Sequence, residues 1–291
     1  MEETRATKPS WNIVLARTYA LYGQHFGTFL KIAFLPAMIT CLYGYTYHIA
    51  FRQAVMHGWL DRRSIGNVPL MAGLGLTQGG IYWIISGFFF AAVASYVLRE
   101  TAEETNPLTD AFSVARSRIG AVVGVTLLAW VLFWVGRIVS GIAVYEAFGR
   151  SPLMRNYWAV IFIVSIPLLL VAGLLSRLGL AIPALMAQPE ISISKALKQS
   201  MASTKGWEPY FMMFLAKSAV VGFLGYWGAS VLLDRMWDRG LLTRATYPWA
   251  QTLLYLCIAM TLETPLFISF AVLYRELQRP EETALSVPAI G

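Results

Sequence analysis

Long apolar segments are the feature that most limits how this chain can fold. Six of them are long enough to cross a bilayer, because a helix rises about 1.5 Å per residue and must cover about 30 Å of hydrocarbon. The segments are Gly27–Ala50, Leu70–Leu98, Gly120–Ala147, Tyr157–Leu185, Tyr210–Leu233 and Trp249–Tyr274. They lack the polar–apolar alternation of membrane β-strands. The sequence therefore predicts an all-α integral membrane protein, a single membrane domain of six transmembrane helices over residues 1–291.

Composition agrees with this prediction and limits the classes of partner that we expect the protein to bind. Hydrophobic residues make up 57% of the chain and charged residues 13%, whereas a soluble domain carries about 25% charged residues. The net charge of +7 is spread over many loops and forms no dense basic patch. We therefore expect no nucleic-acid partner, and we expect the basic loops to face anionic lipid headgroups.

Three short amphipathic stretches precede pairs of apolar segments. They are Ser10–Gly23, Asn106–Gly120 and Ser192–Gly206. Apolar or small residues recur in each at the spacing of one helix face. These residues are Trp11, Val14, Leu15, Thr18 and Tyr19 in the first, Leu108, Ala111, Phe112 and Ala115 in the second, and Ile193, Ala196, Leu197, Ser200 and Met201 in the third. Each stretch is too short and polar to span, so we expect it to lie in the headgroup plane.

The order of these elements indicates three pseudo-repeats. Each amphipathic stretch is followed by two apolar segments, so the units cover about residues 10–98, 106–185 and 192–274, before a C-terminal tail at 275–291. Superposing the stretches aligns Leu15, Phe112 and Leu197. We favour triplication. The alternative is a chance alignment, since any two amphipathic helices can be slid into register.

The distribution of lysine and arginine predicts the orientation. More of the 23 basic residues fall before the first segment, after the last, and between units than in the other loops. Positive charge marks the cytoplasmic side of a membrane protein. We therefore expect both termini and all three amphipathic stretches on the cytoplasmic face of a bacterial inner membrane.

Two C-terminal stretches resemble a known family. One contains Pro183, Ala196-Leu197-Lys198-Gln199-Ser200 and Lys205-Gly206, and the other contains Pro265 and Leu273-Tyr274-Arg275-Glu276-Leu277. Together they resemble the membrane domain of bacterial glycerophosphoryl diester phosphodiesterases and its stand-alone multi-pass relatives. The resemblance implies a multi-pass membrane domain. It implies no activity, because catalysis in that family belongs to a separate soluble TIM-barrel domain, for which this chain has no room.

Glu263 and Lys217 are the candidates for an intramembrane polar pair. A charge in hydrocarbon costs at least about 2.5–3.5 kcal/mol, so each residue needs a protein, water or headgroup contact. They lie in the last two apolar segments, which a short loop joins. We expect the two side chains to meet. Such a pair can be structural, or it can line a pathway for a proton or a substrate, and the sequence leaves both open.

A second candidate site faces the lipid headgroups. Ser200, Thr204 and Lys205 match the hydroxyl-and-base cluster of the resembled family, and Arg177 lies near the end of a predicted span. These four residues are the candidate contacts to lipid phosphate. The alternative is that the hydroxyls simply form the polar face and end of an interfacial helix.

Catalytic and metal sites are not expected. His25, His48 and His57 lack metal-site spacing with a carboxylate or a cysteine. The chain contains no HExxH, GxSxG or P-loop pattern. We therefore expect no catalytic residue, no metal and no cofactor.

These features favour a membrane scaffold or a lipid-interacting protein without catalytic activity. Its expected partners are membrane lipids and either another membrane protein or further copies of itself. A transporter or lipid-translocating protein, with a polar pathway near Glu263 and Lys217, is the alternative. An integral membrane enzyme acting on lipids is the third hypothesis.

Overall fold

Every regular element in the described part of the chain is a helix, which confirms the all-α prediction. The computed structural model describes residues 11–56, 68–99, 107–148, 177–188, 190–205 and 246–278, together with residue 173 and short pieces within 231–243. The helices are α1 (Trp11–Gln24), α2 (Phe26–Met56), α3 (Val68–Arg99), α4 (Pro107–Ser117), α5 (Ile119–Phe148), α7 (Ala181–Ala187), α8 (Ile193–Ser203), α10 (Tyr247–Ile258), the π-helix η3 (Ala259–Glu263) and α11 (Thr264–Gln278).

Four of the six predicted apolar segments correspond closely to helical runs in the described part of the chain. The first three match α2, α3 and α5, and the sixth matches the run from α10 through η3 to α11. The fourth, Tyr157–Leu185, is described mainly at its end, where a turn at Gly179 and Leu180 precedes α7. The fifth, Tyr210–Leu233, lies outside the described residues except for its last three. The sequence pattern therefore located the helices to within a few residues.

Two stretches within these helices are long and apolar enough to cross a membrane. They are Gly79–Arg99 in α3, with 21 residues, and Ile119–Gly136 in α5, with 18 residues. Phe26–Thr40 in α2 is apolar but shorter. Both stretches qualify by length and composition, among the described residues only. The six-span arrangement stays a prediction.

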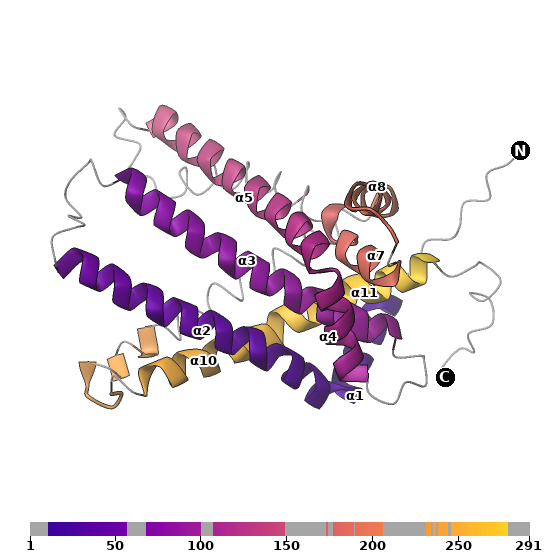
Figure 1. Ribbon diagram of the computed structural model, residues 1–291, viewed down its shortest axis with the longest axis horizontal. Helices are drawn as coiled ribbons and strands as arrows, with labels where there is room; N and C mark the ends of the chain where they lie inside the picture. Colours follow the sequence, from indigo (N-terminus) through magenta and orange to yellow (C-terminus); the bar gives the residue numbers. More distant parts are fainter. Residues whose placement is uncertain are drawn as a thin grey trace, which may run out of the picture.

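α3 is the central helix of the bundle. It contacts α2, α4, α5, α7 and α11. Figure 1 shows α2, α3 and α5 alongside one another, with α10 and α11 crossing behind α2 and α3. The chain reverses direction from α2 to α3 and again from α3 to α5. As a result, the short helices α1, α4, α7 and α8 all gather at one end of the bundle, where α3 ends and α5 begins (Figure 1). We call this the short-helix end.

The hydrophobic core lies at the short-helix end. Phe89 and Phe90 of α3 pack on Phe267 of α11, with ring centroids 5.3 and 4.5 Å apart. The fully buried large side chains come from α1, α2, α3, α5, α7, α11 and the turn before α7, and include Val14, Phe29, Val122, Leu185 and Ile268. Farther from this end, bulky apolar side chains are exposed on α2, α5 and α10, as expected for a surface that faces lipid. They include Leu42, Val135, Ile138 and Leu253.

Glycines allow two close contacts within this core. A Cβ at Gly87 of α3 would lie 2.7 Å from Cγ2 of Thr126 on α5. A Cβ at Gly179, in the turn before α7, would lie 2.6 Å from Cζ of Phe270 on α11. Both distances are well below the usual carbon–carbon contact of about 3.5–4.0 Å. The absence of a side chain at these positions is therefore what lets the helices approach.

The amphipathic stretches form helices α1, α4 and α8, and only part of each predicted apolar face is buried in the bundle. Tyr19, Ile193 and Met201 lie on the predicted apolar faces and are 57%, 37% and 44% exposed. The residues that are fully buried are small or β-branched and lie one turn apart, such as Ala196 and Ser200 in α8. Small residues let each short helix lie close to the bundle, and this leaves the bulkier apolar side chains on the outside.

Candidate functional site

Glu263 lies at an irregular turn of the last long helix. The π-helix η3 (Ala259–Glu263) separates α10 from α11, and Pro265 follows it by two residues. Proline has no N–H, so a carbonyl one turn earlier loses its helical donor. A π-helix turn is one way in which a helix absorbs such a break, and these turns are frequent at functional sites. This irregular turn is what positions the Glu263 side chain.

Tyr22 of α1 supplies a donor to the irregular turn. Its hydroxyl donates to the Met260 carbonyl at 2.9 Å. Burial raises the pKa of the Tyr22 phenol above its ordinary value, which already leaves the group protonated at neutral pH. The contact joins residues separated by most of the chain. It therefore ties the first short helix to the interior of the last long helix.

Tyr82 of α3 is the observed partner of Glu263. Its hydroxyl donates to Glu263 Oε1 at 2.7 Å. The predicted partner, Lys217, lies outside the described residues, so the Glu263–Lys217 pair stays a prediction. Tyr82 was missed in the sequence because a tyrosine inside an apolar segment carries no charge to mark it. The signal that was available is its phenol, which prefers a hydrogen-bond partner when it leaves water.

The Tyr82–Glu263 contact predicts a measurable coupling. We expect Tyr82→Phe and Glu263→Gln to destabilise the protein by about 0.5–1.5 kcal/mol each, because each variant removes or weakens one hydrogen bond between helices. The double variant should lose less than the sum of the two single losses. Thermal unfolding in detergent measures all three variants. Strict additivity would show that the phenol and the carboxyl do not interact.

Ser200 of α8 lies inside the protein and not at the surface. Its side chain is 1% exposed. The hydroxyl donates to the Arg177 carbonyl at 2.6 Å and accepts from the Leu180 amide at 3.1 Å. These two backbone groups flank the turn before α7, where regular helical hydrogen bonding is interrupted. The expectation that Ser200 contacts lipid phosphate is therefore not met in this structure, because its hydroxyl bridges a break in a helix.

The other three headgroup candidates divide between the interior and the surface. Thr204 is completely buried, and its hydroxyl donates to the Ser200 carbonyl at 2.8 Å. Like Ser200, it faces the protein. Arg177 and Lys205 are exposed at the short-helix end. The headgroup hypothesis therefore rests on these two basic residues.

Removal of the Ser200 hydroxyl tests its structural role. We expect Ser200→Ala to destabilise the protein by about 1–3 kcal/mol, because it removes a donor from one buried backbone group and an acceptor from another. The matched control is Ser194→Ala, since Ser194 lies on the exposed face of the same helix. Thermal unfolding in detergent should separate the two variants. Equal midpoints would contradict the bridging role.

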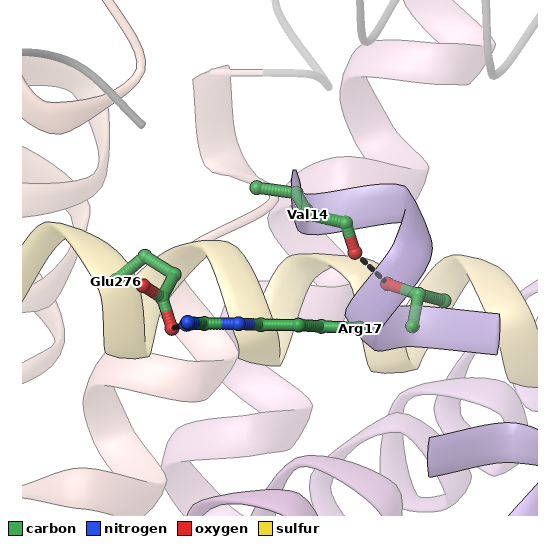
Figure 2. A network of polar contacts seen from close by, with 4 residues as sticks. Val14, Arg17 and Glu276 are labelled. Carbon is green, nitrogen blue, oxygen red and sulfur yellow. Dashed lines mark hydrogen bonds and ion pairs between the residues drawn. The ribbon is translucent and has the colours of Figure 1, made fainter. Parts of the chain in front are cut away.

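An ion pair joins the two ends of the described chain. The Arg17 guanidinium contacts the Glu276 carboxylate, with 28% and 9% of their side chains exposed. Figure 2 shows Arg17 extended from α1 toward Glu276 on α11, beside the hydrogen bond from the Thr18 hydroxyl to the Val14 carbonyl. Because the pair is largely shielded on the Glu276 side, it should contribute more than a fully exposed ion pair would.

A second polar cluster links α7 and α8 to the same part of α11. The amides of Gln188 and Gln199 donate to the Tyr274 hydroxyl at 3.1 and 3.5 Å. At the start of α5, the Arg118 guanidinium donates to the Ile191 carbonyl at 2.6 Å. All these contacts join separate helices at the short-helix end. Their chemistry is that of structural crosslinks between elements.

Metal-ligating groups are not clustered in the part of the chain that the structure describes. No three histidine, cysteine or carboxylate side chains come together there. His25, one of the three histidines considered from the sequence, instead has its Nδ1 2.9 Å from the Tyr96 hydroxyl. No protein-family model, curated protein or solved structure matches this chain. The resemblance to the phosphodiesterase membrane domain therefore stays a prediction.

Proposed function

We propose that this protein is a six-span inner-membrane protein that acts as a scaffold and binds anionic lipid through its short-helix end. The observation that carries the proposal is that three amphipathic helices gather at one end of an apolar bundle. Both termini and this end face the cytoplasm in the proposal. The resemblance to the membrane domain of the phosphodiesterases supports the same class of protein, one without a catalytic centre of its own.

The exposed residues of the short helices have the chemistry of an interfacial surface. Tyr19 of α1 and Met201 of α8 expose bulky apolar side chains. Arg116, Lys195 and Lys198 are exposed on α4 and α8. Apolar side chains at the acyl boundary and basic side chains near phosphate are the two contributions that bind an amphipathic helix to an anionic membrane. Both are present at the same end of the molecule.

Lipid-dependent stability tests the proposed interaction. We expect the protein in nanodiscs of phosphatidylglycerol to unfold at a higher temperature than in phosphatidylcholine. Bound anionic lipid stabilises the folded state by mass action. The difference should shrink at high salt, which screens exposed charges. A variant with glutamine at Arg116, Lys195, Lys198 and Lys205 should lose most of the difference.

The matched control changes basic residues elsewhere on the molecule. Arg235 and Arg239 are exposed and lie before α10, in a predicted outer loop. Replacing both by glutamine should leave the lipid difference largely intact. Equal midpoints in the two lipids, or equal losses in the two variants, would contradict the proposal that the short-helix end binds anionic lipid.

Transport is the second candidate function, and the Tyr82–Glu263 contact is the observation that favours it. A carboxylate beside a π-helix turn and a proline, within a long apolar helix, has the features of an intramembrane polar site. A pathway there would pass Glu263 and, as predicted from the sequence, Lys217. A measurement of proton uptake by proteoliposomes tests this function, and uptake abolished by Glu263→Gln would favour it over the scaffold.

A further inference from the structure

Each of the three short amphipathic helices packs on another helix at the short-helix end. α4 packs on α3, α8 packs on α7, and α1 packs on α11. In the first two pairs, the short helix follows its partner directly along the chain. In the third, the partners come from opposite ends of the chain. α1 therefore has the same kind of neighbour as α4 and α8, although no chain connection brings it there.

The three short helices also share one burial pattern. Over residues 14–20, 111–117 and 196–202, successive side chains are buried, half-buried, exposed, half-buried, buried, exposed and exposed in all three. The sequences of the three segments differ at most of these positions. The register is the one in which Leu15, Phe112 and Leu197 are equivalent. Helices with unlike side chains thus present the same face to the bundle in the same register.

Among the described elements, the three helices on which α4, α8 and α1 pack also contact one another. α3, α7 and α11 each contact the other two. α5 contacts α3, which is the last helix of the preceding unit, and α2 contacts α10, which belongs to the last unit of the chain. The contact between α2 and α10 again joins the first unit to the third. The first unit therefore contacts the second, the second contacts the third, and the third contacts the first, as in a closed ring.

We infer that the chain is a closed ring of three units and that α1 is the strap that closes it. The units are α1–α3, α4–α7 and α8–α11, and α1 occupies on α11 the place that α4 occupies on α3. The Arg17–Glu276 ion pair and the hydrogen bond from Tyr22 to Met260 fasten this closure. The inference rests on the proposed function in one respect, namely that every unit crosses the membrane twice.

A ring has no preferred first unit, and this consequence can be tested. The test protein is a circular permutant that begins between α3 and α4 and joins residue 278 to residue 11 through the natural residues 279–291 and 1–10. Because each unit would cross the membrane twice, the order of units two, three, one preserves the orientation of each. The control permutant has the same linker but opens inside α11, between Phe267 and Ile268, where both side chains are buried.

Two measurements report on the permutants, which are made in a background with Cys41→Ala and Cys257→Ala. The first is thermal unfolding in detergent. We expect the permutant opened between α3 and α4 to melt within about 5 °C of the unpermuted chain, and the control to melt far lower or fail to fold. The second is crosslinking of Arg17→Cys to Glu276→Cys with a bifunctional maleimide, whose spacer replaces the reach of the two long side chains, since cysteines at these positions are too far apart for a direct disulfide. The crosslink should form in both the unpermuted chain and the first permutant.

The outcomes separate the ring from the membrane proposal. If the first permutant is inserted but melts like the control, or if it folds without the crosslink, α1 is not the closing strap and the ring is wrong. Membrane insertion is measured separately by resistance to alkaline carbonate. If carbonate extracts the unpermuted chain itself, the proposed membrane location is wrong. In that case, folding and crosslinking of the permutant still decide the ring.

Discussion

Gly179→Ala is expected to destabilise the protein by about 3 kcal/mol, as overpacked core positions do. A Cβ at this position would lie 2.6 and 2.8 Å from two carbons of the Phe270 ring. The ring is 4% exposed and packs against Phe90, with ring centroids 5.9 Å apart, so it has little room to move. A smaller side chain should relieve the overlap. We therefore expect Phe270→Leu to restore part of the stability that Gly179→Ala removes.

Gly120→Ala is the matched control for this prediction. Gly120 lies in α5, and a Cβ there would meet nothing within 4 Å. Alanine favours the helix over glycine by about 0.8–1.0 kcal/mol, so this variant should be slightly more stable than the parent. Thermal unfolding in detergent shows whether each variant is less or more stable than the parent protein. Gly179→Ala melting with or above Gly120→Ala would contradict the close approach of the turn before α7 to α11.

Bulky replacements at equivalent positions of two short helices are expected to have large and similar effects. Ala111 of α4 and Ala196 of α8 are both 0% exposed. Tryptophan at either position has no space between the short helix and the bundle, so we expect each variant to lose about 3 kcal/mol or to displace its helix. Thermal unfolding and hydrogen exchange of the affected helix measure the two outcomes.

The controls for this pair lie two residues farther along the same helices. Ser113 and Lys198 are exposed and occupy equivalent positions in the shared burial pattern. Tryptophan at either one should change the midpoint little, because surface substitutions usually stay within about 0.5 kcal/mol. If Ser113→Trp and Lys198→Trp destabilise as much as the buried replacements, the three short helices do not share the register that the ring requires.

Helix positions could be predicted from the sequence because the signals are local. α4 begins at Pro107, the position expected from its proline, and α8 is capped by Ser192, whose side chain accepts from the Lys195 amide at 3.3 Å. The lengths of α2, α3 and α5 follow from uninterrupted apolar runs. In each case, the physical cause acts within a few residues of where its effect is seen.

The side-chain contacts could not be predicted because they depend on which helix faces meet. Ser200 was assigned to headgroups from a resemblance, although its place one turn after Ala196 put it on the packed face. Glu263 was paired with Lys217, which lies outside the described residues, because charge is visible in a sequence. The observed partner is the phenol of Tyr82, which hydropathy does not distinguish from its neighbours. The π-helix turn was likewise not predicted, although Pro265 follows it by two residues.

Cysteine labelling in intact cells tests most directly whether this is a membrane protein with its short helices on the cytoplasmic side. Single cysteines replace the exposed residues Ser113 of α4, Ala202 of α8 and Asp238, which lies before α10, in a background that lacks Cys41 and Cys257. A membrane-impermeant maleimide should label Asp238→Cys in intact cells of a bacterial host whose outer membrane has been permeabilised. It should label Ser113→Cys and Ala202→Cys only after the inner membrane is broken. Labelling of Ser113→Cys or Ala202→Cys from outside would contradict the account.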